Sequence, residues 1–349
     1  MRHESGTQVD TGAASGPGIR TIVDRGRFAG AVTPWEDVAW RAAALHWAER
    51  AIGEHGLRET GPREARIRPW SVLIRFRTGR GARDAVWFKA SAPAAAFEAA
   101  LGQTLAEWTP CHVMTPLAVD ADRGWILFPD GGPLFRNALD DGAAGPDDWT
   151  VALGQYARMQ RALTPHAERM TRLGVPGART ADLPGIFDRL VEDHPTLAPD
   201  TRRALLERRP RLLDWCAELD TYAIPDTLDH SDLHDGQILA PAPGRYTFFD
   251  WGDAAVAHPF TSLLVPARAV HEQYGPEAMA RARDAYLEPW AEQGTPMPAL
   301  RRAATLAVRL GALSRAVSWG RLFPGSPADD CHEASAAWLD ELFTAPDLP

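Results

Sequence analysis

The sequence predicts an α+β protein of two lobes, in which an antiparallel sheet with one or two helices is followed by a mainly helical second lobe. Three short β-type runs with turn residues between them lie between residues 65 and 90. Beyond residue 133 the apolar residues instead recur at helical spacing in several long segments. We therefore expect a disordered tail over residues 1–20, an N-lobe over residues 21–128 and a C-lobe over residues 129–349.

The expected N-lobe begins after a stretch without hydrophobic periodicity. Residues 1–20 are rich in Gly, Ser, Thr and Ala, a composition that buries too little apolar surface to fold. Thr33-Pro34-Trp35-Glu36 then has the capping pattern of a helix start, and apolar residues recur at helical spacing up to Ile52. The elements expected next are strands at 65–69, 71–78 and 85–90, a helix at 94–108, and strands at 114–119 and 124–128.

A hinge is predicted between the lobes, because residues 129–133 hold two prolines and two glycines. The helices expected after it occupy residues 147–163, 184–193, 199–220, 260–274, 276–293, 298–322 and 328–343. One hairpin interrupts them, with strands at 237–240 and 245–249. Pro241, Pro243 and Gly244 predict its turn, since they cannot continue a strand ladder.

Composition and charge exclude several classes of protein. A chain of 349 residues with 45% hydrophobic and 24% charged residues is long and apolar enough to fold around a core. No apolar run is long enough to span a bilayer, and the N-terminus lacks the apolar core of a secretory signal, so we expect a cytoplasmic protein without membrane partners. A net charge of −9 without a dense basic patch argues against a nucleic-acid partner. The sequence leaves the oligomeric state open.

Two aspartates flank the predicted hairpin. Asp232 lies in the loop that enters the first strand, and Asp250 directly follows the second strand. Both carboxylates are therefore expected to face one site. One of them can accept the proton of a substrate hydroxyl while the other binds a divalent cation through its oxygens, which is the arrangement that phosphoryl transfer requires.

These segments carry a family resemblance. His230-Ser231-Asp232-Leu233-His234-Asp235-Gly236-Gln237 resembles the catalytic loop, His-x-Asp-Leu-x-x-x-Asn, of aminoglycoside phosphotransferase-like kinases and protein kinases. Phe249-Asp250-Trp251-Gly252 resembles their Asp-Phe-Gly segment. The resemblance runs from about residue 35 to the C-terminus. It implies a bilobal protein-kinase-like fold, with Asp232 as the catalytic base and Asp250 as a Mg²⁺ ligand.

Gln237 departs from the family pattern, which has Asn at that position. Its amide oxygen is the same kind of ligand, one methylene further out, and can bind Mg²⁺ after a small adjustment. Because Mg²⁺ demands near-ideal octahedral geometry, this departure leaves the second metal position open.

Lys89 is the single lysine of the chain, among 37 basic residues. A compact ammonium and a planar guanidinium are not interchangeable, so a retained lysine indicates a site shaped around it. Lys89 ends an apolar strand, at the position where the resembled kinases carry the lysine that binds the α- and β-phosphates. By the same resemblance, Glu98 on the next helix would pair with it, with Glu107 as the rival.

The resemblance also implies where ATP or GTP and the acceptor would bind. The backbone near Phe128 and Asp130 would bind the base and Leu127 would flank it. The family's Gly-rich loop is missing, and Ser71, after Arg68-Pro69-Trp70, is the residue expected at the β-phosphate. The residues expected to line the acceptor are His234, Asp253, His271, Trp290 and Trp319, although core packing is the favoured role for the two tryptophans.

The predicted reaction moves the γ-phosphoryl of ATP or GTP to a hydroxyl of a small molecule, with Mg²⁺. The acceptor is an antibiotic, as in resistance, or a sugar, nucleoside or choline-like metabolite. Six acids against one arginine over residues 321–349 favour a cationic acceptor. Two other classes stay open: a metal-dependent hydrolase that chelates zinc with His230, Asp232 and His234 on one face of a strand, and a nucleotide-binding pseudokinase scaffold, supported by Gln237.

Overall fold

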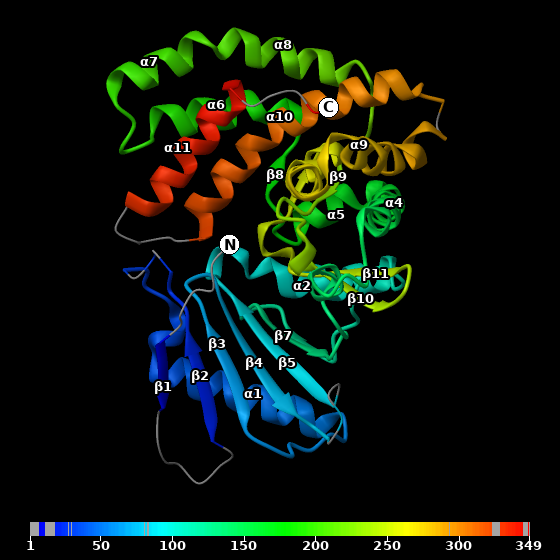
Figure 1. Cartoon of the computed structure of the whole chain (residues 1–349). Helices are drawn as coiled ribbons and strands as arrows, with labels where there is room; N and C mark the ends of the chain where they lie inside the picture. The colour runs from blue at the N-terminus through cyan, green and yellow to red at the C-terminus, as the bar shows by residue number, and fades with distance from the viewer. Residues whose placement is uncertain are drawn as a thin grey trace.

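The computed structural model describes residues 7–10, 18–26, 28, 30–79, 81, 84–292, 294–322, 329–344 and 348. A sheet in the N-terminal part and a larger group of helices in the C-terminal part form two layers that meet at the middle of the molecule (Figure 1). The α+β architecture predicted from the sequence is confirmed.

A seven-stranded sheet dominates the N-lobe. Its strand order is β1-β2-β3-β4-β5-β7-β6, and all neighbours are antiparallel except β2 and β3. The strands are β1 (Thr7–Asp10), β2 (Ile19–Val23), β3 (Arg63–Ile67), β4 (Ser71–Arg77), β5 (Ala85–Ser91), β6 (Ala118–Asp120) and β7 (Trp125–Pro129).

The alternation of side chains along β5 decides which residues face the second lobe. Phe88 points to the core between the sheet and helix α1 (Val38–Glu54), where its ring lies 5.9 Å from that of Trp47. Because successive strand residues point to opposite faces, Lys89 points the other way, toward helix α2 (Phe97–Trp108) and the second lobe.

The expected disordered tail is wrong for part of its length. Residues 7–10 form β1 and residues 19–20 belong to β2, and the two strands pair antiparallel. Ile19 also pairs with Arg63 of β3, so an existing sheet edge provides the hydrogen bonds that the local sequence cannot predict. Residues 1–6 and 11–17 lie outside the described residues.

Helices make up most of the C-lobe, as expected. They are α3 (Phe135–Asp140), α4 (Pro146–Leu163), α5 (Ala167–Arg172), α6 (Leu183–Glu192), α7 (Pro199–Glu207), α8 (Arg209–Asp220), α9 (Leu264–Ala291), α10 (Met297–Leu322) and α11 (Asp329–Thr344). The single helix expected over residues 199–220 is two helices, because Pro210 favours the first turn of a new helix. Within α9, Gly275 has a left-handed φ of 83° and divides the helix where the sequence predicts a break.

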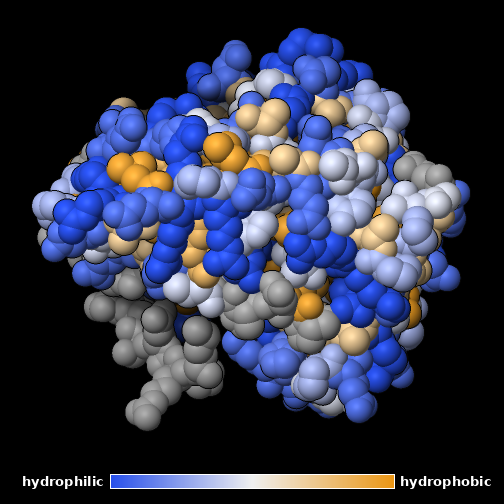
Figure 2. Space-filling model, turned by 90° about the horizontal axis from the view of Figure 1, so that it is seen from above, coloured by the Kyte–Doolittle hydropathy of each residue, from blue (hydrophilic) through white to orange (hydrophobic). Residues whose placement is uncertain are grey.

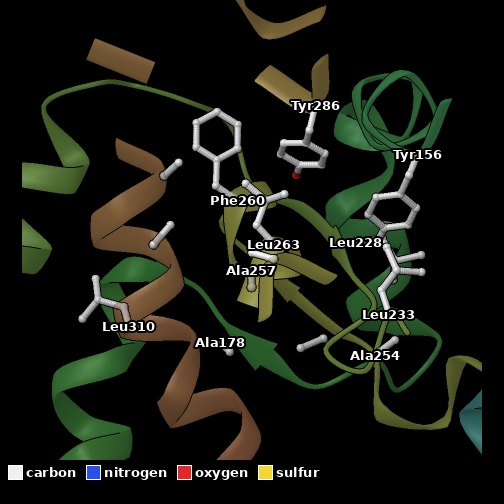
Figure 3. Close-up of a cluster of buried hydrophobic side chains, with 14 of the residues drawn as sticks. Tyr156, Ala178, Leu228, Leu233, Ala254, Ala257, Phe260, Leu263, Tyr286 and Leu310 are labelled. Carbon is white, nitrogen blue, oxygen red and sulfur yellow. The ribbon is translucent and has the colours of Figure 1, made fainter. Parts of the chain in front are cut away.

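Three short strands form a small sheet in the order β8 (Gly177–Ala178), β12 (Ala255–Ala257) and β9 (Thr227–Asp229). The core beside it contains Tyr156, Phe260 and Tyr286, all fully buried (Figure 3). The hydroxyl of Tyr286 donates to Gln160, and Gln160 in turn donates to the carbonyl of Leu228 in β9 at 2.7 Å. This packing fixes the end of β9, where the loop that contains Asp232 begins.

The outer surface of the helical lobe is mostly hydrophilic, with small separate hydrophobic patches (Figure 2). Among the helices in the described part of the chain, none combines the length and the apolar character that crossing a membrane requires.

Candidate active site

The loop after β9 is shaped by Asp229. This buried carboxylate accepts hydrogen bonds from the Ser231 N–H at 3.0 Å, the Ser231 hydroxyl at 2.8 Å and the Ser262 hydroxyl at 2.6 Å. Ser231 has a left-handed φ of 62°, a strained conformation that these bonds hold in place. The turn stops the strand and directs the next residue, Asp232, away from the small sheet.

The hairpin predicted after this loop is present, with β10 (Ile238–Ala242) paired to β11 (Arg245–Phe248). His230 links the loop before β10 to the end of β11, because its Nε2 donates a hydrogen bond to the carbonyl of Phe249 at 2.8 Å. Asp250 follows with a φ of 67°. A left-handed Asp250 ends the extended chain there, and its carboxylate points to the N-lobe.

Lys89 joins the two lobes at this point. Its Nζ lies 2.5 Å from Oε1 of Glu98 and also forms an ion pair with Asp250. Glu98 in turn accepts from the N–H of Trp251 at 2.9 Å and from the hydroxyl of Ser91. The expected pairing of Lys89 with Glu98 is therefore confirmed, and Glu98 rather than Glu107 is the partner.

These contacts set the charge of the cluster. Burial alone would lower the pKa of Lys89, but the carboxylates of Asp250 and Glu98 outweigh it and raise that pKa. Burial would raise the pKa of Asp250, yet the charge and hydrogen bond of Lys89 keep it below its ordinary value. At neutral pH the site thus holds an ammonium and an ionised carboxylate, the pair that a nucleotide phosphate and a divalent cation can use.

Gln237 lies near Asp250 and contributes to the lowered pKa of that carboxyl group. The two residues therefore offer a carboxylate and an amide oxygen side by side, the hard oxygen ligands that Mg²⁺ prefers. The residues present fit a magnesium ion at this position.

Asp232 is held from two sides. Nη2 of Arg315, on α10, lies 3.1 Å from its Oδ1, and Nε2 of His234 lies 3.7 Å from its Oδ2. Nη1 of the same arginine lies 3.8 Å from Oδ1 of Asp253 in the 3₁₀ helix Trp251–Asp253. The sequence analysis missed Arg315. It is one of 36 arginines in the chain, and nothing in the local sequence of its long helix indicates its partner.

At the predicted nucleotide site, the structure contradicts part of what the sequence predicts. Leu127 is fully buried in the core between the sheet and α1, so its side chain cannot flank a base in the cleft. Phe128 pairs with Trp87 and therefore points to the same face of the sheet as Lys89. The N–H of Asp130 already donates to the carbonyl of Ala85 at 3.1 Å, so this donor is not available to a base.

Ser71 and the side chain of Asp130 are the remaining groups of the predicted nucleotide site. Ser71 lies opposite Ser91 in the sheet, on the face that carries Lys89, and its role at the β-phosphate stays a prediction. The carboxylate of Asp130 accepts from the indole N–H of Trp87 at 3.2 Å and from Gly132 N–H at 3.0 Å. Asp130 therefore shapes the hinge through its side chain.

The residues expected to line the acceptor are only partly brought together. His234 and Asp253 lie beside the Asp232–Arg315 pair. Trp319 instead stacks on Phe28, at 5.6 Å between ring centroids, and Trp290 is 1% exposed in the core. His271 is exposed on α9, and its place near the acceptor stays a prediction.

The zinc-hydrolase alternative does not fit this geometry. It requires a strand through His230, Asp232 and His234, but the left-handed Ser231 breaks the extended conformation. His230 is fully buried with its Nε2 bonded to Phe249, and Nδ1 of His234 accepts from the N–H of Gly236 at 2.9 Å. In the part of the chain that the structure describes, no three His, Cys, Asp or Glu side chains are grouped to hold a metal.

Comparison with solved structures shows which known proteins share this fold. No protein-family model and no curated protein matches the sequence. The fold is similar to that of an ethanolamine kinase from Plasmodium vivax, with a TM-score of 0.57 and 13% identity over 89% of this chain and 90% of that one.

The fold is also similar to those of two antibiotic phosphotransferases, with nearly the same TM-score. A macrolide 2'-phosphotransferase from Brachybacterium faecium gives a TM-score of 0.54 and 21% identity, over 88% of this chain and 99% of that one. An aminoglycoside phosphotransferase described in complex with GDP and kanamycin gives 0.54 and 16%, over 85% and 98%. The chain therefore has the fold of the small-molecule kinases that resemble aminoglycoside phosphotransferases, as its motifs indicate.

Proposed function

We propose that this protein is a phosphotransferase that moves the γ-phosphoryl group of ATP or GTP to a hydroxyl of a small molecule. The observation that carries the proposal is the convergence of Lys89, Glu98 and Asp250 from both lobes, at a hairpin whose other end presents Asp232. Residues 21–128 would bind the nucleotide, and residues 129–349 would supply the catalytic loop and the acceptor site.

The chain's own residues account for the main steps of such a reaction. Lys89, held by Glu98, would bind the α- and β-phosphates, and Asp232 would orient the acceptor hydroxyl and take its proton. Asp250 and Gln237 would hold Mg²⁺, which when bound neutralises phosphate charge. Catalysis of this kind consists mainly of positioning and electrostatic stabilisation.

The structural neighbours support two kinds of acceptor. One is described with kanamycin and one is a macrolide phosphotransferase, which supports an antibiotic acceptor and a role in resistance. The ethanolamine kinase supports a small metabolite. Fold analogy alone does not choose between them.

The test is release of ADP or GDP from ATP or GTP with Mg²⁺ and a panel of hydroxylated antibiotics and metabolites. Asp232→Ala should lower turnover by about a thousandfold or more while nucleotide affinity, measured by calorimetry, changes little. Asp200→Asn is the control, because this exposed aspartate lies on α7 and pairs with Arg203 at 2.6 Å. Full activity of Asp232→Ala would refute the base assignment, and nucleotide binding without turnover of any acceptor would favour the scaffold.

A further inference from the structure

Arg315 differs from the other arginines of α10 that the structure describes. Arg301 and Arg302 pair with acids on the surface, with side chains 45% and 46% exposed. Arg309 lies over the ring of Trp215 at 4.9 Å. The Arg315 side chain is 11% exposed and turns inward to the loop after β9. Burial of a guanidinium is costly unless charged partners compensate it, so its partners indicate its role.

The partners of Arg315 are two carboxylates of the candidate site. Nη2 lies 3.1 Å from Oδ1 of Asp232, and Nη1 lies 3.8 Å from Oδ1 of Asp253. Asp253 ends the 3₁₀ helix that directly follows Asp250. One planar guanidinium therefore spans the loop of the proposed base and the segment of the proposed metal ligand.

The guanidinium of Arg315 is held in turn by the C-terminal helix. The ring of Trp338 on α11 lies 5.7 Å from Cζ of Arg315 and 4.9 Å from Cζ of Arg268 on α9. Cation–π contacts of this kind favour a guanidinium over the ring. The ring and the carboxylate of Asp253 therefore restrict the positions that Arg315 can take.

His234 lies on the other side of the Asp232 carboxylate. Its Nδ1 accepts from the N–H of Gly236 at 2.9 Å, so the neutral ring carries its proton on Nε2. That Nε2 lies 3.7 Å from Oδ2 of Asp232, which is longer than a hydrogen bond. The closer charged partner of Asp232 is therefore Arg315, at Oδ1.

We propose that Arg315 is a positioning residue of the phosphoryl transfer, which holds Asp232 with Oδ2 toward the acceptor hydroxyl. This inference rests on the proposed phosphotransferase function and adds a residue that lies outside its motifs. Arg315 acts through Asp232 and takes no proton itself. Because transfer depends on the alignment of base and hydroxyl, a carboxylate that rotates freely should lower kcat more than nucleotide affinity.

The first test separates turnover from nucleotide binding. ADP or GDP release is measured with kanamycin, erythromycin, ethanolamine and glycerol, and kinetic constants are determined for each acceptor that reacts. Arg315→Ala should lower kcat by about 10- to 100-fold and leave KM for the nucleotide within about twofold of the wild type. Arg301→Ala, an exposed arginine of the same helix, is the matched control and should change neither constant.

A double-variant cycle tests whether Arg315 acts through Asp232. Once Asp232→Ala has removed the carboxylate, Arg315→Ala should cause no further loss of kcat. A role in folding alone would lower turnover by the same factor whether or not the carboxylate is present. Arg315→Gln keeps more of the side-chain volume and is carried through the same cycle, to guard against a poorly folded alanine variant.

Chemical rescue tests the guanidinium itself. Ethylguanidinium added to Arg315→Ala should raise kcat by about threefold or more, because it returns a planar cation to the space beside both carboxylates. Urea at the same concentration has a similar planar shape without the charge and should have no effect. Arg301→Ala should respond to neither compound.

The outcomes distinguish the inference from the proposal on which it rests. A wild-type kcat in Arg315→Ala and Arg315→Gln overturns the inference and leaves the phosphotransferase function standing. An equal loss with and without the Asp232 carboxylate, or equal responses to ethylguanidinium and urea, also overturns it. No release with any acceptor or with either nucleotide overturns the proposed function, and the inference with it.

Discussion

Removal of the ammonium from the interlobe cluster should destabilise the protein as well as inactivate it. Lys89→Met keeps most of the side-chain volume but leaves Glu98, whose side chain is 6% exposed, and Asp250 without their cation. Breaking a buried ion pair typically costs about 3–5 kcal/mol. Because the Asp250 side chain is 36% exposed and can regain water, we expect the lower end, about 3 kcal/mol.

Urea unfolding of the nucleotide-free protein at pH 7.5 measures this cost. The double variant Lys89→Met/Glu98→Gln should recover about 2 kcal/mol, because the buried charge is removed with its partner. Arg66→Met, an exposed cation on strand β3 of the same sheet, is the control and should stay within about 0.5 kcal/mol of the wild type. A Lys89→Met protein as stable as the wild type would refute the reasoning.

The pH dependence has a definite sign. The pKa of Asp250 is lowered in the folded protein, so its contribution to stability is present above its ordinary value of about 3.9 and is lost as the pH falls through the folded pKa. The pKa of Lys89 is raised, so its contribution is present below about 10.4 and is lost only above the folded pKa. The stability difference between wild type and Lys89→Met should therefore be constant from about pH 5 to 10 and shrink below it.

Two more variants test the loop and the metal position. Asp229→Ala should lower the free energy of unfolding by about 3 kcal/mol, because it removes the buried acceptor of three hydrogen bonds, two of which hold Ser231. Urea unfolding measures this loss, and a loss below about 1 kcal/mol would contradict the role of Asp229. Gln237→Ala should raise the Mg²⁺ concentration for half-maximal ADP release by about tenfold with unchanged unfolding, and Gln237→Asn should reverse most of that effect. An unchanged Mg²⁺ dependence in Gln237→Ala would exclude Gln237 as a ligand.

Local patterns predict the elements because turn residues and periodicity are local. The hairpin between Gln237 and Phe249 follows from Pro241, Pro243 and Gly244, and its observed strands lie within two residues of those expected. The break at Gly275 follows in the same way. Long-range pairing has no such signal, which is why the strands at Thr7 and at Ile19 appear only when the edge of β3 is known.

In the candidate site, too, local motifs are predictable from the sequence and long-range contacts are not. Lys89 and Asp250 are 161 positions apart, and only an ordered set of motifs, not periodicity, indicates that they meet. Leu127 was misplaced because the direction of a strand side chain depends on register, and a shift of one residue reverses it. Arg315 belongs to no motif, and its ion pair with Asp232 depends on how α10 packs against the loop after β9.

The Lys89–Asp250 ion pair also has a consequence for nucleotide binding. The ammonium proposed for the phosphates and the carboxylate proposed for Mg²⁺ form an ion pair with each other across the two lobes. A nucleotide with its cation would supply both groups with new partners of opposite charge, so entry exchanges one set of ion pairs for another and leaves no charge buried alone. Glu98 is bonded to Lys89, Ser91 and Trp251, and these contacts fix the position of the ammonium. The contacts that join the lobes at Lys89 therefore place the ammonium and the carboxylate where the proposed triphosphate site requires them.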